Sequence, residues 1–173
     1  MTRTRKPPTP LDAAALERLA LRYVERFATS RGRLTTYLGR KLREHGASGE
    51  VDPAVIAERM AERGYVDDAA YAEGRARSMA RRGYGARRVT QVLRHAAIGP
   101  AEIAAATEAT PAIDTALAFA RRRRIGPFAA QVAERPERER QIAAMIRAGH
   151  GYAIARAIVE VPPGAEFDQA KFR

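Results

Sequence analysis

Apolar residues recur at intervals of three and four along almost the whole chain, which is the spacing of one face of an α-helix. The first such stripe runs through Leu16, Leu19, Tyr23, Val24 and Phe27. The same spacing returns in five later groups: Leu34, Leu38 and Leu42; Val55, Ile56 and Met60; Val89, Val92 and Leu93; Ile113 and Leu117; and Ile142, Met145 and Ile146. Alternation with a period of two, which is typical of half-buried strands, does not occur. The pattern predicts an all-α protein with these stripes buried.

Residues that start and stop helices divide the stripes. Three pairs combine a side-chain oxygen that can cap free amides with a proline suited to the first helical position: Thr9-Pro10, Asp52-Pro53 and Thr110-Pro111. Glycines stand where helices are expected to end, at Gly46, Gly64, Gly83, Gly99 and Gly149. These start and stop residues predict about nine helices of about 9 to 17 residues, close to the usual length of globular helices.

A weak internal repeat is visible in three of the predicted helices. Each has two apolar residues four positions apart, then an arginine, then a histidine within three positions; the second apolar residues are Leu42, Leu93 and Ile146. A period of about 50 residues is typical of modular helical arrays. We therefore predict tandem three-helix repeats over residues 10–64, 65–109 and 110–161. A basic tail, 1–9, precedes them and a C-terminal tail, 162–173, follows.

Composition adds a strong positive charge to this picture. The chain has 31 basic and 20 acidic residues, for a net charge of +11, which favours binding to polyanions. All of the basic residues are arginine except Lys6, Lys41 and Lys171. Arginine binds phosphate and carboxylate groups with two parallel hydrogen bonds, so the bias is consistent with recognition. A GC-rich genome explains the arginine and alanine content equally well, and both readings stay open.

The cysteine count and the hydropathy indicate the cellular compartment in which the protein is expected. There is no cysteine, which excludes disulfides and thiolate sites and suits a reducing compartment. No uninterrupted apolar run approaches the ~20 residues needed to cross a bilayer. We expect a cytoplasmic protein with no membrane partner.

The residues that most often carry catalysis do not form a convincing site. His45, His95 and His150 lie about 50 residues apart near the predicted ends of equivalent helices, where a protonated imidazole favours the helix dipole. Asp67 and Asp68 are predicted to cap the helix that follows Val66. The pattern predicts no enzyme, no catalytic residue, no metal site and no cofactor.

Two arginine clusters are the candidate partner-binding or nucleic-acid-binding sites. The 28 residues between Glu73 and Glu102 contain no acid but seven arginines, with Tyr84 in the turn between two helices, where it can stack on a base or pack beneath the turn. A second run of four arginines ends the helix that begins at Pro111, and a solvated basic face is the alternative reading for this run. The candidate residues are Arg75, Arg77, Arg81, Arg82, Tyr84, Arg87, Arg88, Arg94, Arg121, Arg122, Arg123 and Arg124.

Four short motifs follow one another along the chain: Ser30-Arg31 with Leu34; Lys41-Leu42; Gly64-Tyr65-Val66-Asp67-Asp68 with Tyr71-Ala72; and Arg81-Arg82-Gly83-Tyr84-Gly85 with Arg87-Arg88-Val89. The last two have a fairly specific order and spacing. Together the motifs resemble the RecX family of regulatory proteins, which are small helical-repeat proteins that restrain the RecA recombinase. The resemblance covers residues 11 to 108 well and the remainder only by its general pattern.

The resemblance implies three three-helix units in a bent or extended array. It also implies a monomer that binds in the groove of the RecA–single-stranded DNA filament and inhibits filament extension, ATP hydrolysis and strand exchange. Such a protein modulates recombinational repair and the SOS response, and it can contact single- or double-stranded DNA. Two other classes stay open: a basic, repressor-like DNA-binding module that uses the helices 85–95 and 100–108, and an accessory subunit that binds an acidic protein.

The charge generates a first testable prediction, which concerns salt. If about six phosphates are neutralised on binding, raising salt from about 50 mM to about 200 mM weakens affinity about a thousandfold through counterion release. Titrations of recombinase filaments or DNA with the protein at several salt concentrations measure this slope. A flat response would mean that the arginines are only solvated and that apolar contacts carry the binding.

Overall fold

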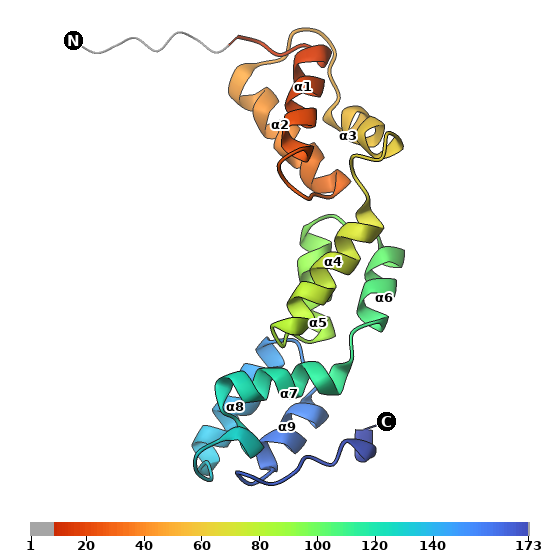
Figure 1. The fold of residues 1–173 in the computed structure, drawn as a ribbon. Helices are drawn as coiled ribbons and strands as arrows, with labels where there is room; N and C mark the ends of the chain where they lie inside the picture. Colours follow the sequence, from red (N-terminus) through yellow and green to blue (C-terminus); the bar gives the residue numbers. More distant parts are fainter. Residues whose placement is uncertain (1–8, 173) are drawn as a thin grey trace, which may run out of the picture. The chain divides into compact units, whose positions relative to one another are not determined.

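The computed structural model describes residues 9–172, and this part of the chain is helical, so the all-α prediction is confirmed (Figure 1). The only β pairing within these residues is an isolated bridge between Leu11 and Ala47. The α-helices of this part are α1 (Ala13–Val24), α2 (Arg31–His45), α3 (Pro53–Glu62), α4 (Asp68–Arg81), α5 (Ala86–His95), α6 (Pro100–Glu108), α7 (Ala112–Arg123), α8 (Arg135–Arg147) and α9 (Tyr152–Glu160). Two short 3-10 helices, η1 (Gly126–Phe128) and η2 (Gln169–Phe172), complete the series.

The helices group into two compact units. The first, here unit 1, contains the chain up to Tyr71 together with Ala96–Gly99; the second, unit 2, contains Ala72–His95 and the chain from Pro100 onward. The division falls inside α4. The three repeat boundaries expected from the sequence stay a prediction.

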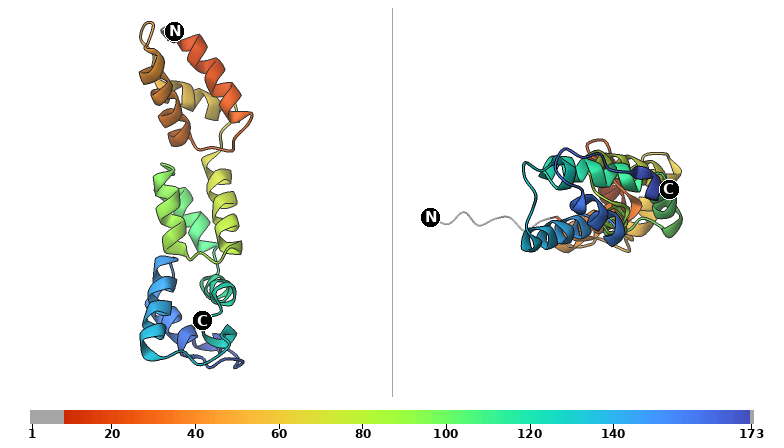
Figure 2. Two further views of the ribbon diagram at one scale, coloured as in Figure 1. Left: turned by 90° about the vertical axis from the view of Figure 1, so that its left-hand side faces the viewer. Right: turned by 90° about the horizontal axis from the view of Figure 1, so that it is seen from below.

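Unit 1 is built on the mutual packing of α1, α2 and α3 (Figure 1 and Figure 2). Each helix contributes part of its predicted stripe, and the side chains of Leu16, Leu34, Leu38 and Met60 are fully buried. Burying a side chain of this size contributes about 1.5 to 3 kcal/mol, so these four residues are major contributors to the stability of the bundle.

The Ser30-Arg31 motif ties α2 to residues far away in the sequence. The Ser30 hydroxyl accepts from the amide of Arg33 and donates to the carbonyl of Ala96. Arg31 binds Asp68 through its backbone amide, at 2.8 Å, and through Nε, at 3.1 Å. Its Nη1 also lies 3.0 Å from a carboxylate oxygen of Glu58. The motif is therefore structural in unit 1, because it joins three segments there.

Unit 2 contains a core formed by α7, α8, α9 and η1. Its buried side chains include Phe119, Ile125, Met145 and Ile158. The ring of Tyr84 packs against this core from the α4–α5 turn, and α5 packs on α6. The packing alternative for Tyr84 is thereby confirmed.

Two of the three predicted proline caps are wrong. Asp52 accepts from the amide of Ala54 at 2.8 Å and caps α3, as predicted. However, α1 begins after Asp12, whose carboxylate accepts from the amide of Ala15 at 2.7 Å, so Thr9-Pro10 is no cap. The Thr110 hydroxyl donates to the carbonyl of Ala106 in α6, and α7 has no side-chain cap.

Most of the predicted glycine stops are confirmed. Gly46, Gly64, Gly83 and Gly149 all have a positive φ, which is the left-handed conformation that ends helices. Gly99 is the exception, since Ala97 adopts the positive φ, 54°, at the end of α5 instead.

Three residues of the predicted stripes are exposed instead of buried. Phe27 is 52% exposed because it lies beyond the end of α1, and Val55 is 54% exposed beside the buried Ile56 in the first turn of α3. Ile146 is 39% exposed because its neighbour Met145 faces the core. Consecutive residues of a helix point about 100° apart, and in these two pairs the helix turns only Ile56 and Met145 toward the core.

The α4–α5 turn of unit 2 approaches other backbone segments so closely that it excludes side chains. Gly83 has a φ of +78°, and a Cβ at this position would lie 2.6 Å from the backbone nitrogen of Phe119. A Cβ on Gly149, in the α8–α9 turn, would lie 2.5 Å from the backbone nitrogen of Arg88. The amide of Gly85 donates to the carbonyl of Ala148 at 2.9 Å. The two turns are therefore in direct backbone contact.

This contact predicts that Gly83→Ala destabilises the protein. The left-handed backbone costs an L-residue about 1 to 2 kcal/mol, and the collision with α7 costs about 1 to 3 kcal/mol. We expect the free energy of unfolding, measured by urea denaturation, to fall by about 2 to 5 kcal/mol.

Two glycines provide matched controls. Gly64 has a φ of +77° with no atom near its missing Cβ, so Gly64→Ala retains only the conformational cost of about 1 to 2 kcal/mol. Gly74 lies inside α4 with open space around it, so Gly74→Ala stabilises by about 0.5 to 1 kcal/mol. Equal effects of the changes at Gly83 and Gly64 would contradict the close approach.

Candidate partner-binding surface

All eleven candidate arginines are exposed, and all of them lie in unit 2. Three are in α4, at Arg75, Arg77 and Arg81, and three are in α5, at Arg87, Arg88 and Arg94. The others are Arg82, directly after α4, and the run Arg121–Arg124 at the end of α7.

The two predicted clusters belong to neighbouring backbone segments. Gly83, between Arg82 and Tyr84, closely approaches Phe119 of α7, which precedes the four-arginine run by two positions. The guanidinium of Arg82 lies 5.4 Å from the centroid of the Tyr84 ring, which is itself packed on the core. The structure therefore places the end of α4 beside α7, a proximity that the sequence did not predict.

Few of these arginines have a protein partner of opposite charge. Arg77 pairs with Glu73 at 3.1 Å, within α4. Arg88 donates to the neutral side chain of Gln91 at 2.6 Å. Among residues 9–172, no carboxylate lies within ion-pair distance of the remaining ones: Arg75, Arg81, Arg82, Arg87, Arg94 and the run Arg121–Arg124. Their charge is available to an external anion.

The run at the end of α7 does not form a single face. Arg121 lies over the ring of Phe128, with its Cζ 5.0 Å from the ring centroid. Arg123 instead lies over Phe119, at 5.8 Å, and Arg124 ends the helix with a left-handed φ of 54°. The guanidinium groups diverge, as expected for four successive residues around a helix.

The histidines separate into two kinds. His45 and His95 are the last residues of α2 and α5, in agreement with the helix-end prediction. His150 follows α8 but is only 3% exposed, and its Nε2 lies 3.0 Å from the carbonyl oxygen of Gly83. Burial lowers the pKa of His150, while the bond to Gly83 opposes this effect. The helix-dipole interpretation is therefore wrong for His150, because burial favours the neutral ring.

Asp67 and Asp68, at the start of α4, have different structural roles. Asp67 accepts from the amide of Ala70 at 2.9 Å, so the predicted cap is confirmed. Asp68 lies in the first turn, but its carboxylate binds Arg31, a partner 37 residues away. Sequence reasoning identified the acid without its ion pair.

No constellation suited to metal binding, meaning three or more His, Cys, Asp or Glu side chains together, occurs within the described residues. In the same part of the chain, no helix has the length and apolar character needed to span a membrane.

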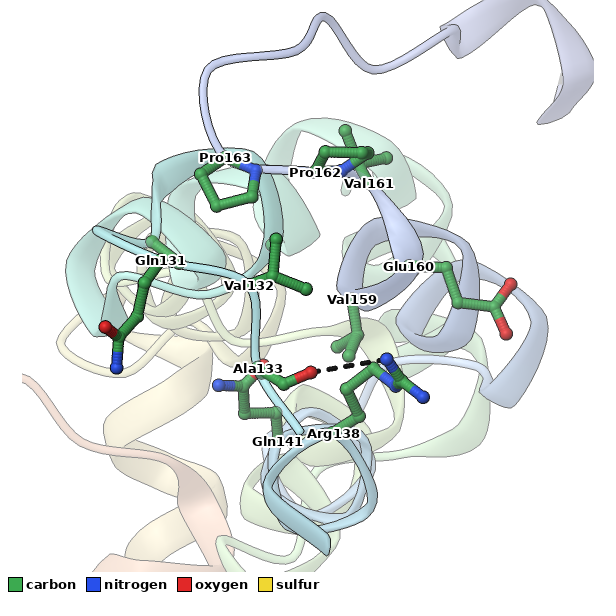
Figure 3. Close-up of a pocket in the computed structure, with 12 residues that line it drawn as sticks. Gln131, Val132, Ala133, Arg138, Gln141, Val159, Glu160, Val161, Pro162 and Pro163 are labelled. Carbon is green, nitrogen blue, oxygen red and sulfur yellow. Dashed lines mark hydrogen bonds between the residues drawn. The ribbon is translucent and has the colours of Figure 1, made fainter. Parts of the chain in front are cut away.

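A cavity of about 210 Å³ lies in unit 2, and none of the candidate arginines lines it (Figure 3). Its lining includes Val132, Gln141, Val159 and Pro163, and Arg138 donates to the carbonyl of Ala133 at 3.2 Å on one side. Among residues 9–172, the buried Oε1 of Gln141 has no hydrogen-bond partner. The cavity contains none of the groups that the sequence singled out.

These features define a class, namely a basic protein built of tandem three-helix units with an exposed arginine surface. The chain is 33% identical over 171 residues to the regulatory protein RecX of Myxococcus xanthus (strain DK1622), a match that covers 91% of each chain. Residues 67–106 match the family described as RecX, second three-helix domain. A crystal structure of regulatory protein RecX has a similar fold, with a TM-score of 0.63 and 20% identity over 84% of this chain and 72% of that one.

The chain belongs to the RecX family of regulatory proteins. The resemblance seen in the motifs is thereby confirmed, as is the predicted fold class of tandem helical repeats.

The environment of His150 predicts a pH dependence of stability. Its lowered pKa means that the unfolded chain takes up the proton more readily. The stability contributed by the neutral ring is complete above about pH 6.5 and is lost as pH falls below that value toward the folded pKa. We expect urea denaturation to show a slope over this range that His150→Gln removes. His95→Gln is the control, because His95 is exposed, and an unchanged slope in His150→Gln would exclude the assignment.

Proposed function

We propose that this protein binds the RecA–single-stranded DNA filament and inhibits its extension, its ATP hydrolysis and strand exchange. Through that inhibition it modulates recombinational repair and the SOS response, with no catalytic turnover of its own. Membership of the RecX family supports the choice of partner, and the net charge of +11 suits a surface that combines acidic protein with DNA phosphate.

The observation that carries the proposal is the arginine surface around the α4–α5 turn. Arg81, Arg82 and Arg87 are exposed and have no acidic partner within residues 9–172, yet they flank a turn held by backbone contacts. A rigid turn restricts the direction of these side chains, so less conformational entropy is lost when they bind an anion.

Inhibition by such a protein requires no chemistry. A protein that binds one state of the filament more tightly than another shifts the population toward the bound state. A helical unit bound in the filament groove also occupies space that an incoming recombinase subunit or DNA strand needs.

An ATPase assay on preformed recombinase filaments tests the proposal directly. We expect added protein to reduce the steady-state rate of hydrolysis in a saturable manner, with a dependence on salt. A pulldown from nuclease-treated lysate supplies the control for DNA bridging, since retention of the recombinase without DNA distinguishes regulation from simple DNA binding. Unchanged hydrolysis at saturating protein would exclude the proposed activity.

The two arginine clusters are predicted to differ in importance. Replacing Arg81 and Arg82 by Glu abolishes inhibition, because both side chains flank the fixed turn and the substitution reverses their charge. The matched change at Arg122 and Arg123 is milder, since the run at the end of α7 diverges and only part of it can face one partner.

Filament ATPase inhibition measures the difference, and circular dichroism with thermal melting controls for folding. We expect both double variants to retain their helicity and melting temperature, because exposed charges contribute little to stability. Equal loss of inhibition in the two variants, or unfolding of the first, would show that the binding face is wrongly assigned.

A further inference from the structure

An unusual row of aromatic rings and guanidinium groups lies in unit 1, where the sequence analysis identified no site. Tyr23 and Tyr37 are stacked, with ring centroids 4.2 Å apart and an interplanar angle of 24°. The ring of Phe27 lies next to that of Tyr23, with their centroids 5.2 Å apart. The rings come from the end of α1 and from α2, which contact each other.

Each end of this row is covered by an arginine. The Cζ of Arg26 lies 5.7 Å from the ring centroid of Phe27, and the Cζ of Arg40 lies 5.7 Å from that of Tyr37. We call the five residues from Arg26 through Phe27, Tyr23 and Tyr37 to Arg40 the aromatic row. It consists of three rings between two guanidinium groups, which attract each other by aromatic and cation–π contact.

Phe27 distinguishes the aromatic row from an extension of the core. Tyr23 and Tyr37 are half-buried and pack against the core of unit 1, but Phe27 lies beyond α1 and is 52% exposed. Leaving a ring of this size in water forgoes part of the free energy that burial would contribute. The exposed face is therefore a surface on which another planar group can stack.

The charge around the row is positive. Arg18, Arg22 and Arg26 are exposed at four-residue intervals on and after α1, and Arg33, Arg40 and Arg43 are exposed on α2. The nearby acids are few and partly engaged: Glu17 is bound by Arg59 and Arg63, and Glu44 by Lys41 and Arg40, which leaves the exposed Glu25.

We propose that the aromatic row is a binding site for single-stranded nucleic acid, in which an unpaired base stacks on Phe27. The guanidinium of Arg26 occupies the position over the ring that a base would take, and it can move aside to bind the adjoining phosphate. Stacked aromatic side chains within a basic surface are the combination that binds single strands with little sequence preference. A duplex does not fit the site, because its bases are already stacked on one another.

The proposal is independent of the recombinase-directed activity, although both concern a partner that contains single-stranded DNA. Unit 1 would hold DNA by stacking, whereas the arginine surface of unit 2 would act through charge. The two proposals can therefore fail separately, and the test of this one uses DNA alone.

The absence of tryptophan from the chain allows a direct test. Phe27→Trp introduces a single tryptophan, whose emission can be excited selectively, at the stacking position. We expect single-stranded oligothymidylate to quench its emission, while an abasic oligonucleotide of the same length and charge binds more weakly and does not quench. A duplex of equal length also leaves the emission unchanged.

Affinity measurements on the otherwise natural chain complete the test. Phe27→Ala is expected to weaken oligothymidylate binding about five- to a hundredfold, the range that loss of one stacked base produces. Val55→Ala is the matched control, since Val55 is an equally exposed apolar side chain of the same unit, at 54%, and its loss leaves affinity unchanged. Thermal melting checks that both variants stay folded.

Three outcomes would overturn the proposal. Equal quenching by abasic and normal oligonucleotides would show that only charge acts at the site. Equal affinities of the Phe27→Ala and Val55→Ala variants would exclude stacking on Phe27. A change in the emission of the Phe27→Trp variant with recombinase but not with DNA would assign the row to a protein partner. None of these outcomes decides whether the parent protein inhibits filament ATP hydrolysis, which the ATPase assay tests separately.

Discussion

The contact between two backbone turns is the constraint on which the candidate arginine surface of unit 2 depends. In the α4–α5 turn, Gly83 packs against the backbone of α7, and Gly85 packs against Gly149 and His150 of the α8–α9 turn. The His150 ring also hydrogen-bonds to the carbonyl of Gly83. Main chain meets main chain at these points, so even one methyl group on Gly83 cannot be accommodated without displacement. Because such a contact has little freedom to slide, the backbone positions of the arginines on both sides of the turn are fixed.

The residues that stabilise the fold differ from the candidate binding residues. Buried aliphatic side chains such as Leu16, Leu38 and Ile158 hold the helices together, and the candidate arginines lie outside these cores. Most of these arginines lack acidic partners within residues 9–172, so an anionic partner need not displace an internal ion pair. Exposed charges contribute little to folding, which leaves these positions open to selection for binding.

The two units would present different chemistry to the proposed nucleoprotein partner. Unit 2 has exposed guanidinium groups, whose attraction to phosphate is long-ranged and reduced by salt. Unit 1 has the aromatic row, where the proposed stacking on Phe27 would act only at contact and would be less sensitive to salt. A chain with both would suit a partner that displays phosphate, acidic protein and unpaired bases together.

Sequence alone determined the helical class, most helix ends, the arginine clusters and the family, because these depend on spacing within a few residues or on short contiguous motifs. It also placed the Asp52 and Asp67 caps, which bond to amides two or three positions away. Only the tertiary structure decided which neighbour of a pair is buried, as with Met145 over Ile146. It also decided the partner of Asp68, the burial of the His150 ring and the stacking of Tyr23 on Tyr37. Such features depend on how whole helices pack, since a side chain's environment comes from segments that helical periodicity does not relate to one another.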